Sequence, residues 1–396
     1  MTLTLKKSNK FNLYDICFVV SAFSMLIILL SIPYEINRGI SLGTYAIAGC
    51  SMLVFVKYLA EHSHKMPTQG LILLLLIAVC MVALGFSHSN IRANLVKLVC
   101  FLEIPIFMLC SKEITSKRTV EVFLWVQYAL SFYYIYLSFS DKAHLFKGPY
   151  GLIQMEVLTM SYHNPNEASM YLTCCLLVLM IGITFYKQNW IKILFAVNSI
   201  YMVYLINLTQ SRAGIISALI AIIMFVCNKW IKINKIFTRI ALVIPLVMAV
   251  LIYFFNEKLA EIKILGESME TGRKDVFEQV FSVLEFTEIF TGDFATHAFD
   301  NLHNVYISIF ATIGIFGVLC YVFYFEKTLF LIAEKKDLTS YSKVACIGVL
   351  TLLVYSSVEA TIFTGGSAYA MCFVGIYVFA IANWSTTNKQ KKEILL

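Results

Sequence analysis

The chain has few charged residues, few prolines and no recognisable polar domain. Of its 396 residues only 14% are charged and only six are proline, whereas 59% are hydrophobic. Charged residues make up about a quarter of an ordinary soluble domain, so this composition excludes one. The mean hydropathy of +0.78 points the same way. With no internal repeat visible, residues 1–396 are predicted to form a single integral membrane domain.

Metal-binding and disulfide patterns are also missing. The eleven cysteines all fall in or beside apolar runs, and none forms a Cys-x-x-Cys pair. Cys174 and Cys175 are adjacent in an apolar run, which favours a role as small hydrophobic residues. The histidines show no ligand spacing either. We therefore expect no disulfide framework, no structural metal and no cofactor.

Long apolar runs are abundant. Runs of about 17 to 22 residues are long enough to cross about 30 Å of hydrocarbon as helices. We predict an all-α, polytopic membrane protein with about twelve transmembrane helices. The predicted spans are 14–33, 42–60, 69–86, 94–110, 121–140, 169–186, 191–207, 212–228, 237–255, 304–325, 344–363 and 367–383.

The basic residues predict the orientation. If the N-terminus is internal, about twenty Lys and Arg residues fall on the inner side and about nine on the outer side. Both termini are therefore predicted to be cytoplasmic, with two large outer loops at 141–168 and 256–303. The net charge of +7 is then an orientation signal, and it does not require a nucleic-acid partner.

The first outer loop supplies candidate substrate-binding residues. Its end reads SYHNPNEASMYL, where Gly, Pro and Asn nearby favour turns before the sixth helix. This places His163, Asn166 and Glu167 at a helix mouth, and Lys142 and Lys147 earlier in the loop. The alternative is ordinary loop and helix-capping chemistry.

The second outer loop contains TGRKDVFEQVFSVLEFTEIF. Phe277, Phe281 and Leu284 recur at helical spacing, which predicts an amphipathic helix lying at the membrane surface. Arg273 and Lys274 fall in its first turn, where a bound anion would offset their repulsion by the helix dipole. The alternative is a solvated cationic pair that touches lipid headgroups.

Arg212, His303 and Asn304 are predicted at the outer ends of the eighth and tenth helices. An arginine at the bilayer centre costs roughly 2.5–3.5 kcal/mol, so it needs either the interface or a partner. Guanidinium groups bind phosphate in a bidentate geometry. A histidine, with its ordinary pKa near 6.5, suits proton transfer at neutral pH. Together they suggest a site for a phosphorylated lipid, against the alternative of a snorkelling arginine and a surface histidine.

Three stretches occur in an order that resembles a known family. SRAG after an apolar helix, TGRKDVFEQ opening the second outer loop and HNVYISIFATIGIFG closing it are similar to the bacterial O-antigen ligase and polysaccharide polymerase family, over roughly residues 195–325. The resemblance implies a helical C-type glycosyltransferase fold in the bacterial inner membrane, acting from the periplasmic side on undecaprenyl-pyrophosphate-linked glycans. It implies phosphate-binding arginines at Arg212 and Arg273 and a catalytic histidine at His303. It also implies a chain-length regulator and a flippase as partners.

Two features favour a polymerase of repeat units over a ligase within that family. The second outer loop has about 47 residues, whereas ligases tend to have a longer one, and the first outer loop contains the stretch HNPNE. The absence of arginine from 141–168 departs from the polymerase pattern. A different class, a transporter or flippase, is the remaining alternative. Lys97, Glu103 and Glu359 lie in predicted spans and could line its pathway.

Overall fold

The computed structural model describes residues 11–86, 91–140, 157–160, 162, 165–261, 263–264, 267–268, 273–300, 302–335, 338–359 and 366–381. These residues are helical except for connecting turns and a small antiparallel pair of strands, β1 (Lys263–Ile264) and β2 (Glu267–Ser268). The prediction of an all-α polytopic protein is confirmed at this level.

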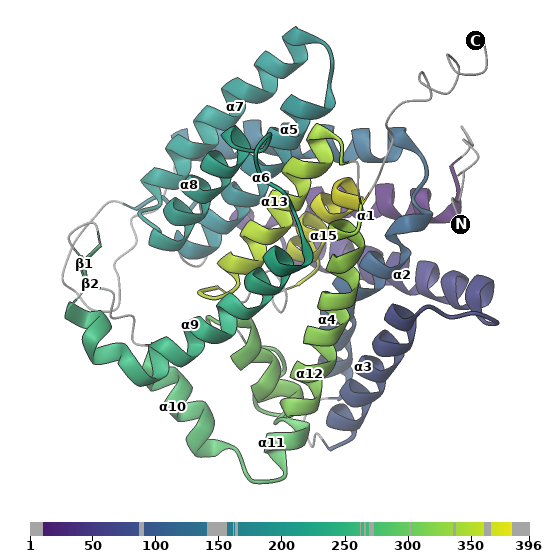
Figure 1. The fold of residues 1–396 in the computed structure, drawn as a ribbon, viewed down its shortest axis with the longest axis vertical. Helices are drawn as coiled ribbons and strands as arrows, with labels where there is room; N and C mark the ends of the chain where they lie inside the picture. Colours follow the sequence, from purple (N-terminus) through teal and green to yellow (C-terminus); the bar gives the residue numbers. More distant parts are fainter. Residues whose placement is uncertain are drawn as a thin grey trace.

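The helices follow one another with short connections over most of the described chain (Figure 1). They are α1 (Leu13–Ser31), α2 (Asn37–His62), α3 (Thr68–Gly85), α4 (Ile91–Cys110), α5 (Lys117–Phe139), α6 (Pro165–Phe185), α7 (Asn189–Leu208), α8 (Arg212–Val226), α9 (Lys235–Glu261), α10 (Arg273–Val283), α11 (Glu288–Thr291), α12 (Val305–Ala333), α13 (Ser340–Tyr355) and α15 (Ser367–Ile381), with short 3-10 turns η1 (Ile32–Tyr34) and η2 (Ser111–Glu113).

Nine of the described helices are long and apolar enough to cross a membrane. They are α1 to α7, α9 and α12, and each overlaps a predicted span. The three other predicted spans overlap shorter apolar helices, α8, α13 and α15, which have 15, 16 and 15 residues. The chain is therefore a polytopic helical protein of the kind that a membrane requires, because helices satisfy their own backbone hydrogen bonds in lipid.

The centre of the bundle is formed by α6, α13 and α15 (Figure 1). Every residue of α15 is buried, as are most residues of α6 and α13. Two glycines allow aromatic rings to approach closely: a Cβ atom at Gly182 would meet the ring of Phe195, and one at Gly375 would meet the ring of Phe123. Such close approach between helices is typical of membrane bundles.

One end of the bundle collects charged contacts, and we call it the charged end. There α1, α5 and α9 begin and α12 and α15 end. The buried carboxylate of Asp15 accepts hydrogen bonds from the backbone nitrogen of Ser116 at 3.1 Å and from Thr119 Oγ1 at 2.9 Å. Lys235 pairs with Glu334 at 2.6 Å. At the opposite end α6, α8 and α15 begin and α13 ends; we call it the site end.

Helix α12 is two helical segments with a break at Ile313 and Gly314. The rings of Tyr306 and Tyr321 lie only 6.3 Å apart. In a straight helix these residues would be separated by about 22 Å along the axis. The chain before the break therefore folds back along the chain after it. The sequence predicted one continuous helix over 304–325, and this part of the prediction is wrong.

Residues 293–312 form a re-entrant hairpin, whose two arms run in opposite directions. The backbone nitrogen of Asp293 donates to Ala311 O at 2.7 Å, and that of Phe299 donates to Thr312 Oγ1 at 2.8 Å. Gly314 has φ +68°, and a Cβ atom there would meet the backbone of α11. Glycine is therefore required where the hairpin closes against α11.

Candidate functional site

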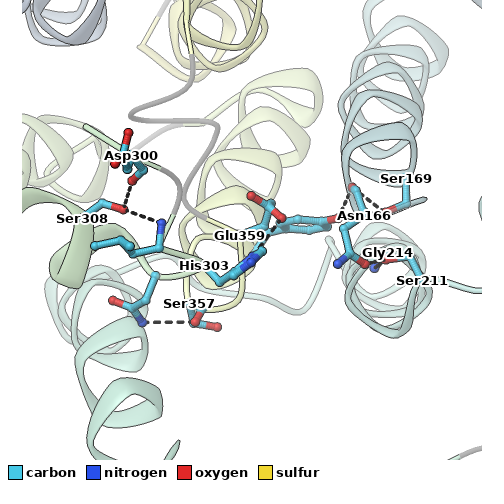
Figure 2. A network of polar contacts seen from close by, with 12 residues as sticks. Asn166, Ser169, Ser211, Gly214, Asp300, His303, Ser308, Ser357 and Glu359 are labelled. Atoms are coloured by element: carbon cyan, nitrogen blue, oxygen red, sulfur yellow. Dashed lines mark hydrogen bonds and ion pairs between the residues drawn. The ribbon is translucent and has the colours of Figure 1, made fainter. Parts of the chain in front are cut away.

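His303 lies at the tip of the re-entrant hairpin, immediately before α12. Its Nδ1 atom is 3.7 Å from Oε2 of Glu359, which is 1% exposed, whereas the imidazole is 34% exposed (Figure 2). His303 has φ +59°, a conformation that non-glycine residues adopt uncommonly. Backbone strain of this kind is concentrated at functional sites. The fold thus presents one accessible imidazole beside one buried carboxylate.

Asn304 holds this tip in place. Its Oδ1 caps α12 by accepting hydrogen bonds from the backbone nitrogens of Tyr306 at 3.0 Å and Ile307 at 3.3 Å. Its Nδ2 donates to Pro245 O at 2.8 Å and to Ser357 O at 3.1 Å. Asn304 is fully buried, so both ends of its amide are used inside the protein. The sequence proposed it as a substrate-binding residue, but the structure places it as a support for His303.

Glu359 reaches the site because α13 ends at Tyr355 and the chain turns after it. The predicted span continued to residue 363, whereas the helix ends at Tyr355 and a turn follows. The backbone nitrogen of Glu359 donates to Tyr355 O at 3.1 Å, and that of Val305 donates to Ser356 O at 3.1 Å. These bonds join the start of α12 to the end of α13 and set the carboxylate beside His303.

A second polar group lies where α6 and α8 begin. Ser211 caps α8: its Oγ accepts a hydrogen bond from the backbone nitrogen of Gly214 at 3.2 Å and donates to Asn166 Oδ1 at 2.8 Å. Arg212 follows as the first residue of α8 and is half-buried. The sequence correctly placed both Arg212 and Asn166 at helix starts, and the structure brings these starts together.

Tyr355 connects the two groups. Its hydroxyl donates to Asn166 O at 3.1 Å and lies 2.8 Å from Ser169 Oγ. Tyr355 is also one helical turn before Glu359. A continuous run of contacts therefore extends from the start of α8, through Asn166 and Tyr355, to the pair of Glu359 and His303.

Three of the helices that reach the site are short. Helices α8, α13 and α15 each have one end at the site end, and their 15 or 16 residues span only about 22–24 Å. The hydrocarbon layer is about 30 Å thick. If the charged end lies at one boundary of the bilayer, the polar groups of the site lie several ångströms inside the other.

Two further carboxylates lie near the start of α15. Glu103 of α4 is fully buried, and its Oε1 accepts a hydrogen bond from Ser367 Oγ at 2.9 Å. Glu167 of α6 accepts one from the hydroxyl of Tyr369 at 2.6 Å. The transporter interpretation treated Glu103 as lining a pathway, but here it packs inside the bundle.

Lys97 of α4 lies near Asp300 of the hairpin. It is exposed, and its charge acts on Asp300, which also faces His297 at 4.0 Å. Burial raises the pKa of Asp300, while Lys97 opposes that shift. No local sequence motif marks His297 or Asp300, and only the fold brings them to notice.

The predicted amphipathic helix exists as α10. Phe277 is fully buried and packs with Ala249 and Ile252 of α9, whereas Phe281 stays partly exposed. Lys274 is paired with Glu278 at 3.6 Å. The position of α10 at the membrane surface remains a prediction.

Some predicted site residues cannot be placed. Arg273 begins α10, but its side chain lies outside the described part of the structure, as do Lys142, Lys147 and His163.

Within the described residues no group of three His, Cys, Asp or Glu side chains could hold a metal ion. No known protein family, curated protein or solved structure matches this chain.

Proposed function

We propose that this chain is a membrane glycosyltransferase that joins undecaprenyl-pyrophosphate-linked oligosaccharide repeat units into O-antigen or capsular polysaccharide. The observation that carries the proposal is the pairing of His303, at the tip of the hairpin, with the buried carboxylate of Glu359. A partly exposed base held by a buried carboxylate is a recurring arrangement for activating a hydroxyl group. The resemblance of the three sequence stretches supplies the substrate class.

The reaction needs a base and a site for an anion. A sugar hydroxyl of the acceptor attacks the anomeric carbon of the donor glycan, and the bond from that carbon to the pyrophosphate oxygen breaks. The hydroxyl proton moves to His303, and Glu359 stabilises the imidazolium that forms. Undecaprenyl pyrophosphate leaves with the bonding electrons, and Arg212 and Arg273 neutralise its charge.

The proposed placement rests on the distribution of basic residues along the sequence and on the resemblance. All twelve apolar helices cross the inner membrane, both termini lie in the cytoplasm, and the site end faces the periplasm within the outer leaflet. The fold is then a C-type glycosyltransferase bundle. A site several ångströms inside the bilayer boundary suits a phosphate that is carried on a lipid.

A ligase that transfers the glycan to lipid A-core is the second candidate, and one observation favours it. A polymerase handles two pyrophosphates and needs cations for both, and Lys274 is one of the few lysines in the two outer loops. In the structure Lys274 is already paired with Glu278. The second outer loop is shorter than the one expected of a ligase, and this still favours the polymerase.

The test is transfer by the purified protein in detergent, supplied with undecaprenyl-pyrophosphate-linked repeat units and no sealed compartment. A ladder of longer glycans supports the polymerase. Transfer only when lipid A-core is added identifies the ligase. Absence of transfer, together with movement of lipid-linked glycan across sealed vesicles that contain the protein, would identify a flippase and overturn the proposal.

A further inference from the structure

The orientation of the Asn166 amide is fixed by hydrogen bonding. Ser211 has one hydroxyl proton, and its oxygen already accepts from the backbone nitrogen of Gly214 at 3.2 Å. The hydroxyl donates this proton to the side chain of Asn166 at 2.8 Å, and the atom that it meets is the carbonyl oxygen Oδ1. The NH₂ group of Asn166 must then point away from Ser211.

That NH₂ group faces the other half of the site. In Figure 2 the amide nitrogen of Asn166 lies on the side of His303 and Glu359, and its oxygen lies on the side of Ser211 and Gly214. Among the residues that the structure describes, no hydrogen-bond acceptor is recorded for this nitrogen. Asn166 is also only half-buried, so a ligand can reach it.

The neighbouring groups favour an anionic ligand. Arg212, which directly follows Ser211, has five donors and no acceptor. The NH₂ group of Asn166 likewise offers donors only. The nearby carboxylates of Glu167 and Glu359 already face the Tyr369 hydroxyl and His303. A phosphate oxygen, which accepts hydrogen bonds and donates none at neutral pH, fits such a surface better than a sugar hydroxyl, which does both.

We propose that Asn166 donates a hydrogen bond from Nδ2 to a pyrophosphate oxygen of the polyprenyl-linked substrate, and that Ser211 is the positioning residue that fixes the amide for this contact. This inference rests on the proposed function. It adds a neutral donor to the anion site and gives Ser211 a role besides capping α8.

The first experiment uses undecaprenyl pyrophosphate without an attached sugar. Its binding to the full-length protein is measured in lipid nanodiscs. Asn166→Leu has nearly the same shape and no donor, and Asn166→Asp replaces the donor by a charged acceptor. We expect the Kd to rise about tenfold or more for either variant, as for the loss of one hydrogen bond to a charged group. The control is Asn207→Asp, the same amide-to-carboxylate change at an exposed position in the last turn of α7.

The second experiment separates positioning from capping. Ser211→Thr keeps both hydrogen bonds, and we expect binding within twofold of the wild type. Ser211→Gly is still an acceptable N-cap, because glycine costs a cap only a few tenths of a kcal/mol. It cannot orient Asn166, so we expect a several-fold rise in Kd. In the Asn166→Leu background Ser211→Gly should cause no further rise, because the amide that it orients is gone.

The outcomes distinguish the two proposals. If the wild type does not bind undecaprenyl pyrophosphate at all, the proposed function fails. If the wild type binds and both Asn166 variants bind equally well, the inference is overturned while the function stands. Unchanged binding with a raised KM for the glycan-linked substrate would assign the amide to a sugar. An additive effect of Ser211→Gly in the Asn166→Leu background would leave Ser211 with capping alone.

Discussion

At the scale of single residues, Glu359 is the side chain whose burial requires most explanation. A carboxylate removed from water is costly unless a positive or hydrogen-bonding group compensates it. Its Oε2 lies 3.7 Å from His303 Nδ1, which is longer than a hydrogen bond and within reach of an ion pair. Such contacts often tighten when a substrate binds. The carboxylate is therefore suited to stabilising the imidazolium form of His303.

We expect His303→Ala to lower the rate of glycosyl transfer by about 10² to 10⁴, the usual contribution of a positioned base. Glu359→Gln keeps the shape and removes the charge, so it should lower kcat by a smaller factor and leave KM nearly unchanged. Initial rates with purified protein measure both effects. Immunoblots of the membrane fraction check that each variant inserts at the normal level. Wild-type rates for His303→Ala would remove it from the mechanism.

Arg212 gives a second prediction at this scale. Arg212→Ala and Arg273→Ala should each abolish transfer, whereas the Arg→Lys variants should recover part of it, because lysine keeps the charge and loses the bidentate fork. Arg38→Ala is a matched control, since Arg38 is exposed at the start of α2 and lies outside the proposed site. Glycan laddering is the readout. Full ladders in both alanine variants would mean that these arginines only reach the interface.

At the scale of elements, the re-entrant hairpin depends on two glycines, Gly292 at φ +74° and Gly314, and Gly314 gives the prediction. At φ +68° an alanine would cost about 1–2 kcal/mol from backbone strain alone. Its Cβ atom would also meet the backbone of Phe290 and Thr291. We expect Gly314→Ala to lower the midpoint of thermal unfolding in detergent and to reduce transfer. Gly49→Ala in α2, where a Cβ atom meets nothing within 4 Å, should be neutral or slightly stabilising. Equal midpoints for the two variants would contradict the close contact with α11.

The elements also show what the sequence could and could not reveal. Apolar length alone predicted the helices, because lipid admits few alternatives. The hairpin was missed because VYISIFATIGIFG is apolar throughout and reads as one helix; its break depends on contact with α11. The pair of His303 and Glu359 was missed for a related reason. Each residue was noted, but only tertiary structure brings the ends of α12 and α13 together.

At the scale of the whole molecule, the orientation is testable with phosphatase fusions. Fusions after Ser140 and Leu284 should be active, and one after Thr386 inactive, because the first two follow the chain to the periplasm and the last to the cytoplasm. Leu284 is preferred to a position near residue 301, where a fusion would interrupt the re-entrant hairpin. Activity after Thr386 would reverse the orientation and move the site to the cytoplasmic side.

The role in the cell is tested by deleting the gene. If the protein is the polymerase of lipopolysaccharide repeat units, the mutant should carry single repeat units on lipid A-core and lack the long ladder. The reason is that ligation of one unit needs no polymer. Gel profiles of extracted lipopolysaccharide provide the measurement. Bare core with polymer accumulating on undecaprenyl pyrophosphate would instead identify the ligase.

The turn after α13 also determines when the site can form during synthesis. Val305, Asn304 and His303 are held by Ser356, Ser357 and Glu359, respectively. The ribosome adds these three partners only after all the helices up to α13 have been made. A nascent chain that stops before Ser356 would insert most of its helices and still lack the groups that hold the histidine. Truncated chains would therefore remain inert in the membrane, unable to consume the lipid carrier.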